Sequence, residues 1–248
     1  MKKLLCLLLS AGMMLAFAGC AESDVKSDGE SVPNSSQSVQ APTESEKDDA
    51  ETVYAAITPT KEGVAEFAEK LRETLDMDSI AGTPINEENV YNVTPPEVAE
   101  QTDFKIFKHS DSCASFVMTK DGVYELGNSF GGYGVISAVP CDPDGDGNKD
   151  LLVASSWGSG IHRSEISVFN SVTREFEVIF STMDTVPRTV DLAFSSSYKD
   201  EERGTVYKVC SVTVDRETVD RMYVNYTVGE LFGTVEIVDG KATFKTVS

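Results

Sequence analysis

From Phe104 onward, runs of β-branched and aromatic residues alternate with short polar segments rich in Gly, Asp, Asn and Ser. Apolar runs of about 4–8 residues bounded by turn residues are typical of β-strands. We expect a mainly β fold of antiparallel meander sheets, arranged as a sandwich or as a partial, propeller-like assembly. The predicted strands are 104–108, 114–119, 122–126, 134–139, 150–154, 164–169, 175–181, 189–195, 205–214, 221–230, 233–238 and 241–246.

A helical pattern precedes these strands. Thr58-Pro59 supplies a cap and a first turn for an amphipathic helix near 59–77. Its apolar positions recur at helical spacing: Val64, Phe67, Ala68, Leu71 and Leu75. A short second helix is expected after Thr83-Pro84, and Thr94-Pro95-Pro96 should interrupt the pattern. The fold therefore has one or two helices on the N-terminal side of its strands.

Aspartates stand at alternate positions between the strands predicted at 134–139 and 150–154. Calcium takes about 6–8 oxygen ligands at about 2.3–2.6 Å, and alternate residues of a curled loop can point inward to supply them. Glycines between the aspartates reduce the steric cost of the curl. The spacing predicts a calcium site formed by Asp142, Asp144, Asp146, the Asn148 carbonyl and Asp150. The alternative is a metal-free hairpin turn, because Asp, Gly, Asn and Pro are also ordinary turn residues.

The loop fits the EF-hand pattern in its first half only, because Val153 stands where that pattern has a bidentate Glu. The segment Phe130–Ser156 resembles instead the FG-GAP and VCBS-type repeats of integrin-like β-propellers. Phe130-Gly131 stands at the family's Phe-Gly, the four loop aspartates match its calcium ligands, and Leu151-Leu152-Val153 matches the strand that follows. Ala154-Ser155-Ser156 replaces the family's Gly-Ala-Pro. One good copy covers about 27 of 248 residues, which does not support a complete propeller of about 4–8 blades.

The amino terminus combines a basic start at Lys2 and Lys3 with a short apolar run from Leu4 to Ala16. Phe17-Ala18-Gly19-Cys20 then resembles the lipobox of bacterial lipoproteins, although Leu is usual where Phe17 stands. The resemblance implies a signal peptide over 1–19, lipidation of Cys20, and anchoring at the extracytoplasmic face of the cell membrane. The alternative is an ordinary secretory signal, and both interpretations export the chain.

Residues 20–52 are rich in Ser, Asp, Glu, Pro and Gln, a composition that predicts a disordered tether. Residues 53–248 are enough for one β-rich domain with a sizeable core. The formal net charge of −20 argues against nucleic acid as a partner. Beyond Cys20, three cysteines at 113, 141 and 210 allow buried thiols or one disulfide, and the sequence leaves this choice open.

One polar cluster follows the strand that leaves the calcium loop. Trp157, His162 and Arg163 flank a Gly-Ser-Gly turn and suggest a recognition surface, although a purely structural turn is favoured. No nucleophile elbow, zinc motif or phosphate loop is found. We expect a binding module for a protein or carbohydrate ligand. The alternatives are an extracytoplasmic hydrolase that uses His162 and a purely structural envelope protein.

Overall fold

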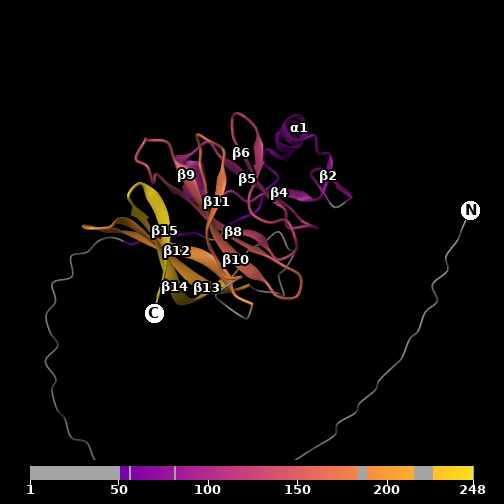
Figure 1. Ribbon diagram of the computed structural model, residues 1–248. Coiled ribbons are helices and arrows are strands. Elements are labelled where there is room, and N and C mark those ends of the chain that lie inside the picture. Colours follow the sequence, from indigo (N-terminus) through magenta and orange to yellow (C-terminus); the bar gives the residue numbers. More distant parts are fainter. Residues whose placement is uncertain (1–50, 56, 81, 184–188, 215–225, 248) are drawn as a thin grey trace, which may run out of the picture. The chain divides into compact units, whose positions relative to one another are not determined.

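The computed structural model describes residues 51–55, 57–80, 82–183, 189–214 and 226–247, all within one compact unit that spans 47–248. It confirms the mainly β, antiparallel fold with two helices (Figure 1). The helices are α1 (Val64–Leu75) and α2 (Pro96–Gln101). The strands are β1 (Thr52–Val53), β2 (Ser79–Ile80), β3 (Thr83–Pro84), β4 (Val90–Asn92), β5 (Lys105–His109), β6 (Ser115–Met118), β7 (Val123–Glu125), β8 (Gly134–Cys141), β9 (Asp150–Trp157), β10 (Arg163–Phe169), β11 (Phe176–Ser181), β12 (Asp191–Asp200), β13 (Gly204–Val214), β14 (Tyr226–Val238) and β15 (Lys241–Thr246).

Three antiparallel meanders follow one another along the chain. Strands β4–β7 form the first four-stranded sheet, β8–β11 form the second, and β12–β15 form the third. The short strand β1 pairs with the free edge of β12 and so extends the third sheet to five strands. Each strand pairs with its neighbour in the sequence within a meander. Helix α2 lies in the connection from β4 to β5, and the aspartate-rich loop joins β8 to β9.

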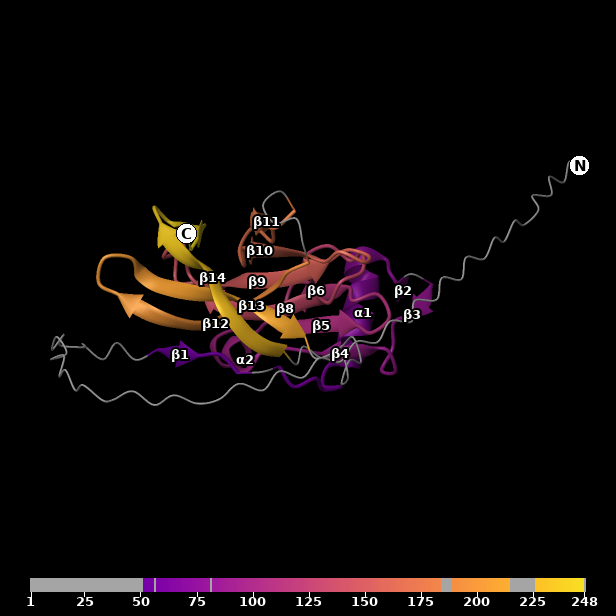
Figure 2. The same ribbon diagram turned by 90° about the horizontal axis from the view of Figure 1, so that it is seen from below.

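The three sheets and α1 are stacked in layers (Figure 2). Helix α1 packs on the first sheet through Phe67, whose ring stacks on Phe107 at 4.3 Å between centroids. Strand β9 shows how the middle sheet is covered on both faces, because successive residues of a strand point to opposite sides. Leu151 belongs to the core shared with the first sheet, whereas Leu152 belongs to the core shared with the third. This double burial explains the unbroken apolar run of β9.

Two predictions about the helices require correction. A second helix was expected after Thr83-Pro84, but these residues form β3 of the short β2–β3 hairpin, and a turn follows them up to β4. The second helix is α2, which begins at Pro96, inside the segment that was expected to interrupt the pattern. Proline fits the first turn of a helix because the amide hydrogen that it lacks has no helical acceptor there.

The strands predicted at 221–230 and 233–238 are not separate, because β14 runs unbroken from Tyr226 to Val238. The missing side chain of Gly233, within this strand, makes room for the neighbouring strand. A Cβ atom at Gly233 would lie 2.4 Å from the Phe244 ring and 2.5 Å from the Lys245 carbonyl oxygen. The glycine therefore permits close packing within the sheet and does not end the strand.

The structure also decides between buried thiols and one disulfide for the three cysteines of the domain. Cys113, Cys141 and Cys210 are buried and form no disulfide. Neither α1 nor α2 has the length and apolar character of a membrane-spanning helix. The predicted signal peptide, Cys20 and most of the predicted tether lie outside the described residues.

Candidate calcium loop and its neighbouring cavities

The aspartate-rich loop is the hairpin connection between β8 and β9, and the pairing of Cys141 with Asp150 closes its base. Gly145 and Gly147 have φ angles of 70° and 88°, in the left-handed region that side chains other than glycine rarely occupy. The loop is therefore curled as its glycines predict. It starts from two strands that are buried along almost their whole length, so its base is held rigidly.

Three of the predicted ligands converge in this loop. One carboxylate oxygen from each of Asp142, Asp144 and Asp146 lies within 4.8 Å of the other two. At such a separation each pair of charges repels by about 1 kcal/mol even at the dielectric constant of bulk water. Lys149 gives limited compensation, with Nζ 4.0 Å from Asp142 Oδ2. Asp142 Oδ1 is buried and has no hydrogen-bond partner among the described residues.

Local hydrogen bonds maintain the curl of the loop. Asp144 Oδ1 accepts the amide hydrogen of Asp146 at 3.3 Å. The carboxylate of Asp146 accepts the amide of Asn148 at 2.7 Å and its side-chain Nδ2 at 2.9 Å. The side-chain bond from Asn148 is the largest cause of the lowered pKa of Asp146. Asn148 therefore contacts the carboxylate of Asp146 through two nitrogen donors, and the predicted ligation by its carbonyl oxygen stays a prediction.

Asp150 lies outside the group of three. Its Oδ1 accepts the amide hydrogen of Ser171 at 2.7 Å, and its Oδ2 accepts Nδ2 of Asn170 at 3.3 Å. Burial raises the pKa of Asp150, and the nearby Asp144 and Asp146 raise it further. In this structure Asp150 ties the aspartate-rich loop to the turn between β10 and β11, a structural role that the sequence pattern did not suggest.

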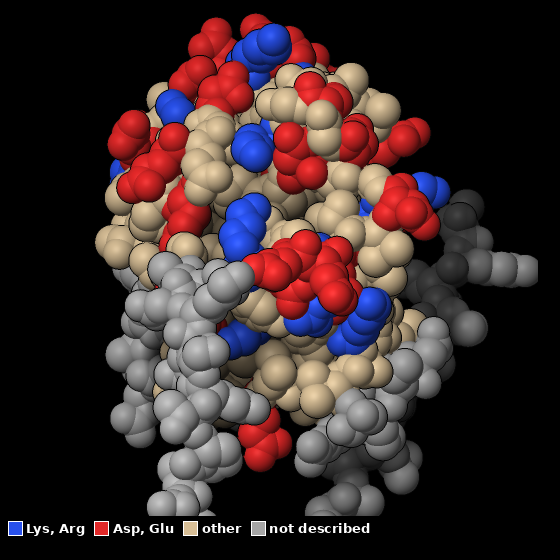
Figure 3. All heavy atoms as spheres, turned by 90° about the vertical axis from the view of Figure 1, so that its left-hand side faces the viewer, with Lys and Arg blue, Asp and Glu red and all other residues tan. Residues whose placement is uncertain are grey.

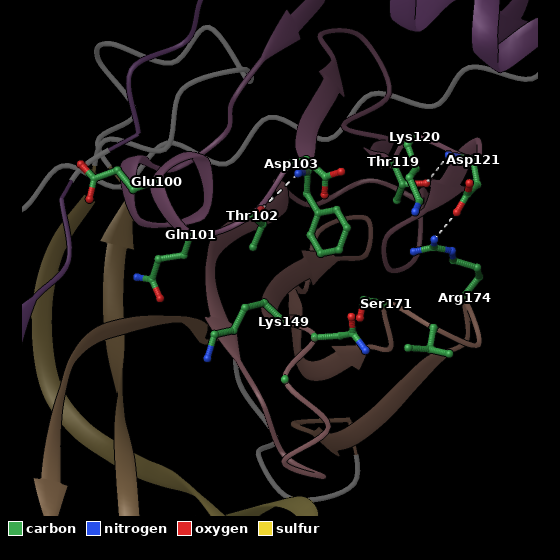
Figure 4. Close-up of a pocket in the computed structure, with 14 residues that line it drawn as sticks. Glu100, Gln101, Thr102, Asp103, Thr119, Lys120, Asp121, Lys149, Ser171 and Arg174 are labelled. Carbon is green, nitrogen blue, oxygen red and sulfur yellow. Dashed lines mark hydrogen bonds and ion pairs between the residues drawn. The ribbon is translucent and has the colours of Figure 1, made fainter.

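A polar cavity of about 720 Å³ borders the second half of the loop (Figure 4). Gln101 and Lys149 lie on one side of it, whereas Asp121 and Arg174 form an ion pair on the opposite side. The walls come from α2 and the segment after it, the β6–β7 turn, the aspartate-rich loop and the β10–β11 turn. Charges of both signs face this space, which suits a polar ligand better than an apolar one.

A second cavity, of about 410 Å³, is also lined by residues at the two ends of this loop. Gln101 and Lys149 line both cavities, so the two are neighbours between α2 and the loop. Glu97 of α2 and Asp142 of the loop also line the second cavity. The sequence pattern did not single out Glu97, because a glutamate in the first turn of a helix is commonplace.

The predicted cluster of Trp157, His162 and Arg163 is assembled only in part. Trp157 and Arg163 are paired across β9 and β10. The His162 ring packs edge-on against Tyr133 at 4.8 Å between centroids, and its Nδ1 lies 3.4 Å from the Asp191 carboxylate. His162 is thus directed to an internal acidic partner, as expected of a structural histidine.

Neither histidine links a serine hydroxyl to an acid, as a hydrolytic triad requires. Ser156 and His162 both bond to Asp191, so the carboxylate stands between them. His109 contacts Ser112 through Nδ1 at 3.0 Å, and its Nε2 is buried without a hydrogen-bond partner among the described residues. Burial lowers the pKa of His109.

Lys108 on β5 is a buried charged residue that sequence reasoning missed. Its side chain is completely buried, and Nζ donates a hydrogen bond to the carbonyl oxygen of Val135 at 3.1 Å. Burial lowers the pKa of Lys108 from 10.5 to about 8. Phe107 precedes it and His109 follows it in β5, so nothing in the local pattern indicated that this lysine is buried.

The surface agrees with the acidic composition of the chain. Acidic side chains are spread over the face shown in Figure 3, with fewer basic groups among them. No protein-family model, curated protein or solved structure matches this chain.

Proposed function

We propose that this protein is an exported lipoprotein, anchored through Cys20 at the extracytoplasmic face of the membrane, whose β domain is a calcium-stabilised binding module. The lipobox-like segment supports the anchor, and the acidic loop supports the calcium site. Calcium organises the loop between β8 and β9, and the loop in turn forms walls of two cavities. A protein or carbohydrate ligand would bind in the polar cavity.

The convergence of Asp142, Asp144 and Asp146 is the observation that carries this proposal. Three carboxylates this close repel one another, a bound cation would offset that repulsion, and oxygen ligands suit calcium. The buried, unpartnered Oδ1 of Asp142 is a second, independent indication, because a buried carboxylate oxygen without a donor or a metal is costly. The curl at the loop glycines and the Asx-type hydrogen bonds would by themselves suit a metal-free turn equally well.

The hydrolase alternative has weaker support. His162 is turned toward Asp191 and Tyr133, and Ser156 hydrogen-bonds to Asp191. A general base must reach the nucleophile that it activates. The binding interpretation requires no such arrangement and uses the polar cavity that adjoins the loop.

Thermal unfolding of the domain, in chelator and then in calcium, tests the proposal. Calcium that binds the folded loop alone adds about 1.4 kcal/mol at ten times its dissociation constant. For a domain of this size the melting temperature should rise by about 3–6 °C. Asp146→Ala should remove most of this shift, because it deletes one of the three converging carboxylates. Magnesium should replace calcium poorly, because it requires a tighter octahedron.

Asp78→Ala is the matched control, since Asp78 is exposed and lies outside the loop. It makes the same change of charge and should keep the full calcium shift. Equal melting of the wild-type domain in both conditions, with no calcium bound by calorimetry, would reduce the loop to an acidic turn.

A further inference from the structure

Two glycine-rich loops contact each other at the end of the second sheet that is opposite the aspartate-rich loop. Residues 126–133 lead into β8, and residues 158–162 connect β9 to β10. Gly158 donates its amide hydrogen to the carbonyl oxygen of Phe130 at 2.6 Å and accepts that of Gly132 at 2.9 Å. A Cβ atom on Gly131 would lie 2.6 Å from the Gly158 carbonyl oxygen. The loops are therefore held together by a backbone approach that requires glycine.

Large apolar side chains are exposed at this end of the sheet. Phe130 is 64% exposed and Ile161 is 51% exposed. Their backbones are neighbours, because a Cβ atom on Gly158 would lie 2.4 Å from the carbonyl oxygen of Ile161. Met183, which is 59% exposed, follows β11 at the same end, since β11 ends beside the start of β10. The exposed side chains of Phe130, Ile161 and Met183 are called the apolar tip below.

The two loops of the apolar tip carry no charge. Residues 126–133 and 158–162 contain no Asp, Glu, Lys or Arg, although these types make up 25% of the chain. The first charged residue after the second loop is a cation, Arg163. Asp191, the acid that contacts His162, is buried and accepts a hydrogen bond from Ser156. Exposed apolar side chains in an uncharged setting are typical of surfaces that contact a protein or a membrane.

The small size of the apolar tip favours a lipid surface over a protein partner. A stable protein interface buries about 800 Å² on each partner and requires a close fit, which three side chains on separate loops do not supply. A bilayer requires no matching shape, and it accepts aromatic and aliphatic side chains at the boundary between headgroups and acyl chains. A nearby arginine suits the phosphates of the headgroups.

The proposed anchor would bring such a surface within reach. Strand β1, which follows the predicted tether, pairs with Ser197 of β12, and Asp191 at the start of β12 contacts His162 beside the apolar tip. Ser197 and Asp191 are six residues apart in one strand, a distance of about 20 Å. A flexible segment of the length from Cys20 to Glu51 spans about 30 Å. A domain held by this tether could therefore place its apolar tip on the bilayer.

We propose that the apolar tip inserts into the surface of the membrane that carries the lipid anchor and so orients the domain on it. Phe130 and Ile161 would enter the headgroup boundary. Their own affinity is small, and the tether compensates by raising the effective concentration of the domain at the bilayer. The polar cavity borders the aspartate-rich loop at the other end of β8 and β9, so it would stay open to solvent. The inference rests on the proposed anchor and is independent of the calcium site.

The test couples the chain from Cys20 to Ser248 through the Cys20 thiol to a maleimide lipid in phosphatidylcholine vesicles. The cysteines of the domain are buried, so coupling is directed to Cys20. The chain contains one tryptophan, and Trp157→Phe therefore gives a background in which a single new tryptophan reports its own position. Phe130→Trp places this probe in the apolar tip.

Val238→Trp in the same background is the matched control. Val238 is also an exposed apolar residue, but it lies at the other end of the fold, where the β14–β15 turn adjoins the aspartate-rich loop. We expect brominated acyl chains to quench the Phe130→Trp emission by about half or more, because the probe would lie at the acyl boundary. The Val238→Trp emission should stay unchanged.

A second pair of variants tests the contribution of Ile161. Ile161→Ser, added to the Phe130→Trp chain, should lower the quenching at least about twofold, because it removes apolar surface that would enter the bilayer. Val172→Ser makes a similar change at an exposed valine of the β10–β11 turn and should leave the quenching unchanged. If Trp157→Phe does not fold, Trp157 itself serves as the probe, since it adjoins Gly158, and Phe130→Ser should then abolish its quenching.

The proposal is overturned if the Phe130→Trp probe is quenched no more than the Val238→Trp probe. It is also overturned if the uncoupled chain self-associates through a contact that Ile161→Ser removes while vesicles leave the probe unquenched, because the apolar tip is then an interface between copies. Chemical coupling makes the result independent of lipidation in cells, and a repeat in chelator makes it independent of calcium. A failure of the proposed anchor or of the calcium site is therefore distinguishable from a failure of this inference.

Discussion

Lys108 offers a direct test of how burial controls charge in this fold. Lys108→Met removes a completely buried ammonium group and keeps a flexible side chain of similar length. The pKa of Lys108 is about 8 in the folded protein in place of 10.5, so folding lowers this pKa by about 2.5. At about 1.4 kcal/mol per unit, the charged form costs the fold about 3 kcal/mol.

The sign of the pH dependence follows from proton linkage. Between about pH 8 and 10.5 the unfolded chain holds a proton on Lys108 that the folded chain has lost, so wild-type stability gains from rising pH. Below pH 8 both states are protonated and the full cost is present. Lys108→Met has no such group. We expect its stability relative to wild type to fall by about 3 kcal/mol between pH 7 and 10.5.

Urea unfolding of both proteins at several pH values between 7 and 10.5 measures this difference. Tyrosines that titrate in the same range affect both proteins alike and cancel. Lys105→Met is the control on the same strand, because Lys105 is partly exposed and pairs with Glu66 at 3.6 Å. Its effect should stay within about 0.5 kcal/mol. A difference between Lys108→Met and wild type that does not change with pH would refute the reasoning.

Two further predictions concern the third sheet and the anchor. Gly233→Ala should destabilise the domain by about 1–3 kcal/mol in urea unfolding, because the added Cβ would lie 2.4 Å from the Phe244 ring. Thr234→Ala is the control, and equal stability of Gly233→Ala and wild type would contradict the close packing. Cys20→Ser should abolish lipidation and release the protein from membranes, as followed by mass spectrometry and fractionation, and a covalent lipid retained on the variant would contradict the anchor.

Local sequence patterns determined much of the secondary structure of this protein. Strand β9 could be predicted from Leu151-Leu152-Val153-Ala154, because a strand buried on both faces has no polar face to interrupt its apolar run. Helix α1 follows from the spacing of Val64, Phe67 and Leu71, which places one apolar stripe on the first sheet. The curl of the aspartate loop follows from Gly145 and Gly147. Each of these features depends on residues close together in the chain.

Only the tertiary structure decided which distant residues meet. Glu97 and Asp142 line one cavity although they are far apart in the sequence, and Asp150 is directed to Ser171 by the packing of the β10–β11 turn. Lys108 is buried because another sheet covers its side of β5, where it reaches Val135 of β8. Sequence periodicity records which face of an element is apolar, whereas burial, charge pairing and cavities depend on the partner that covers that face.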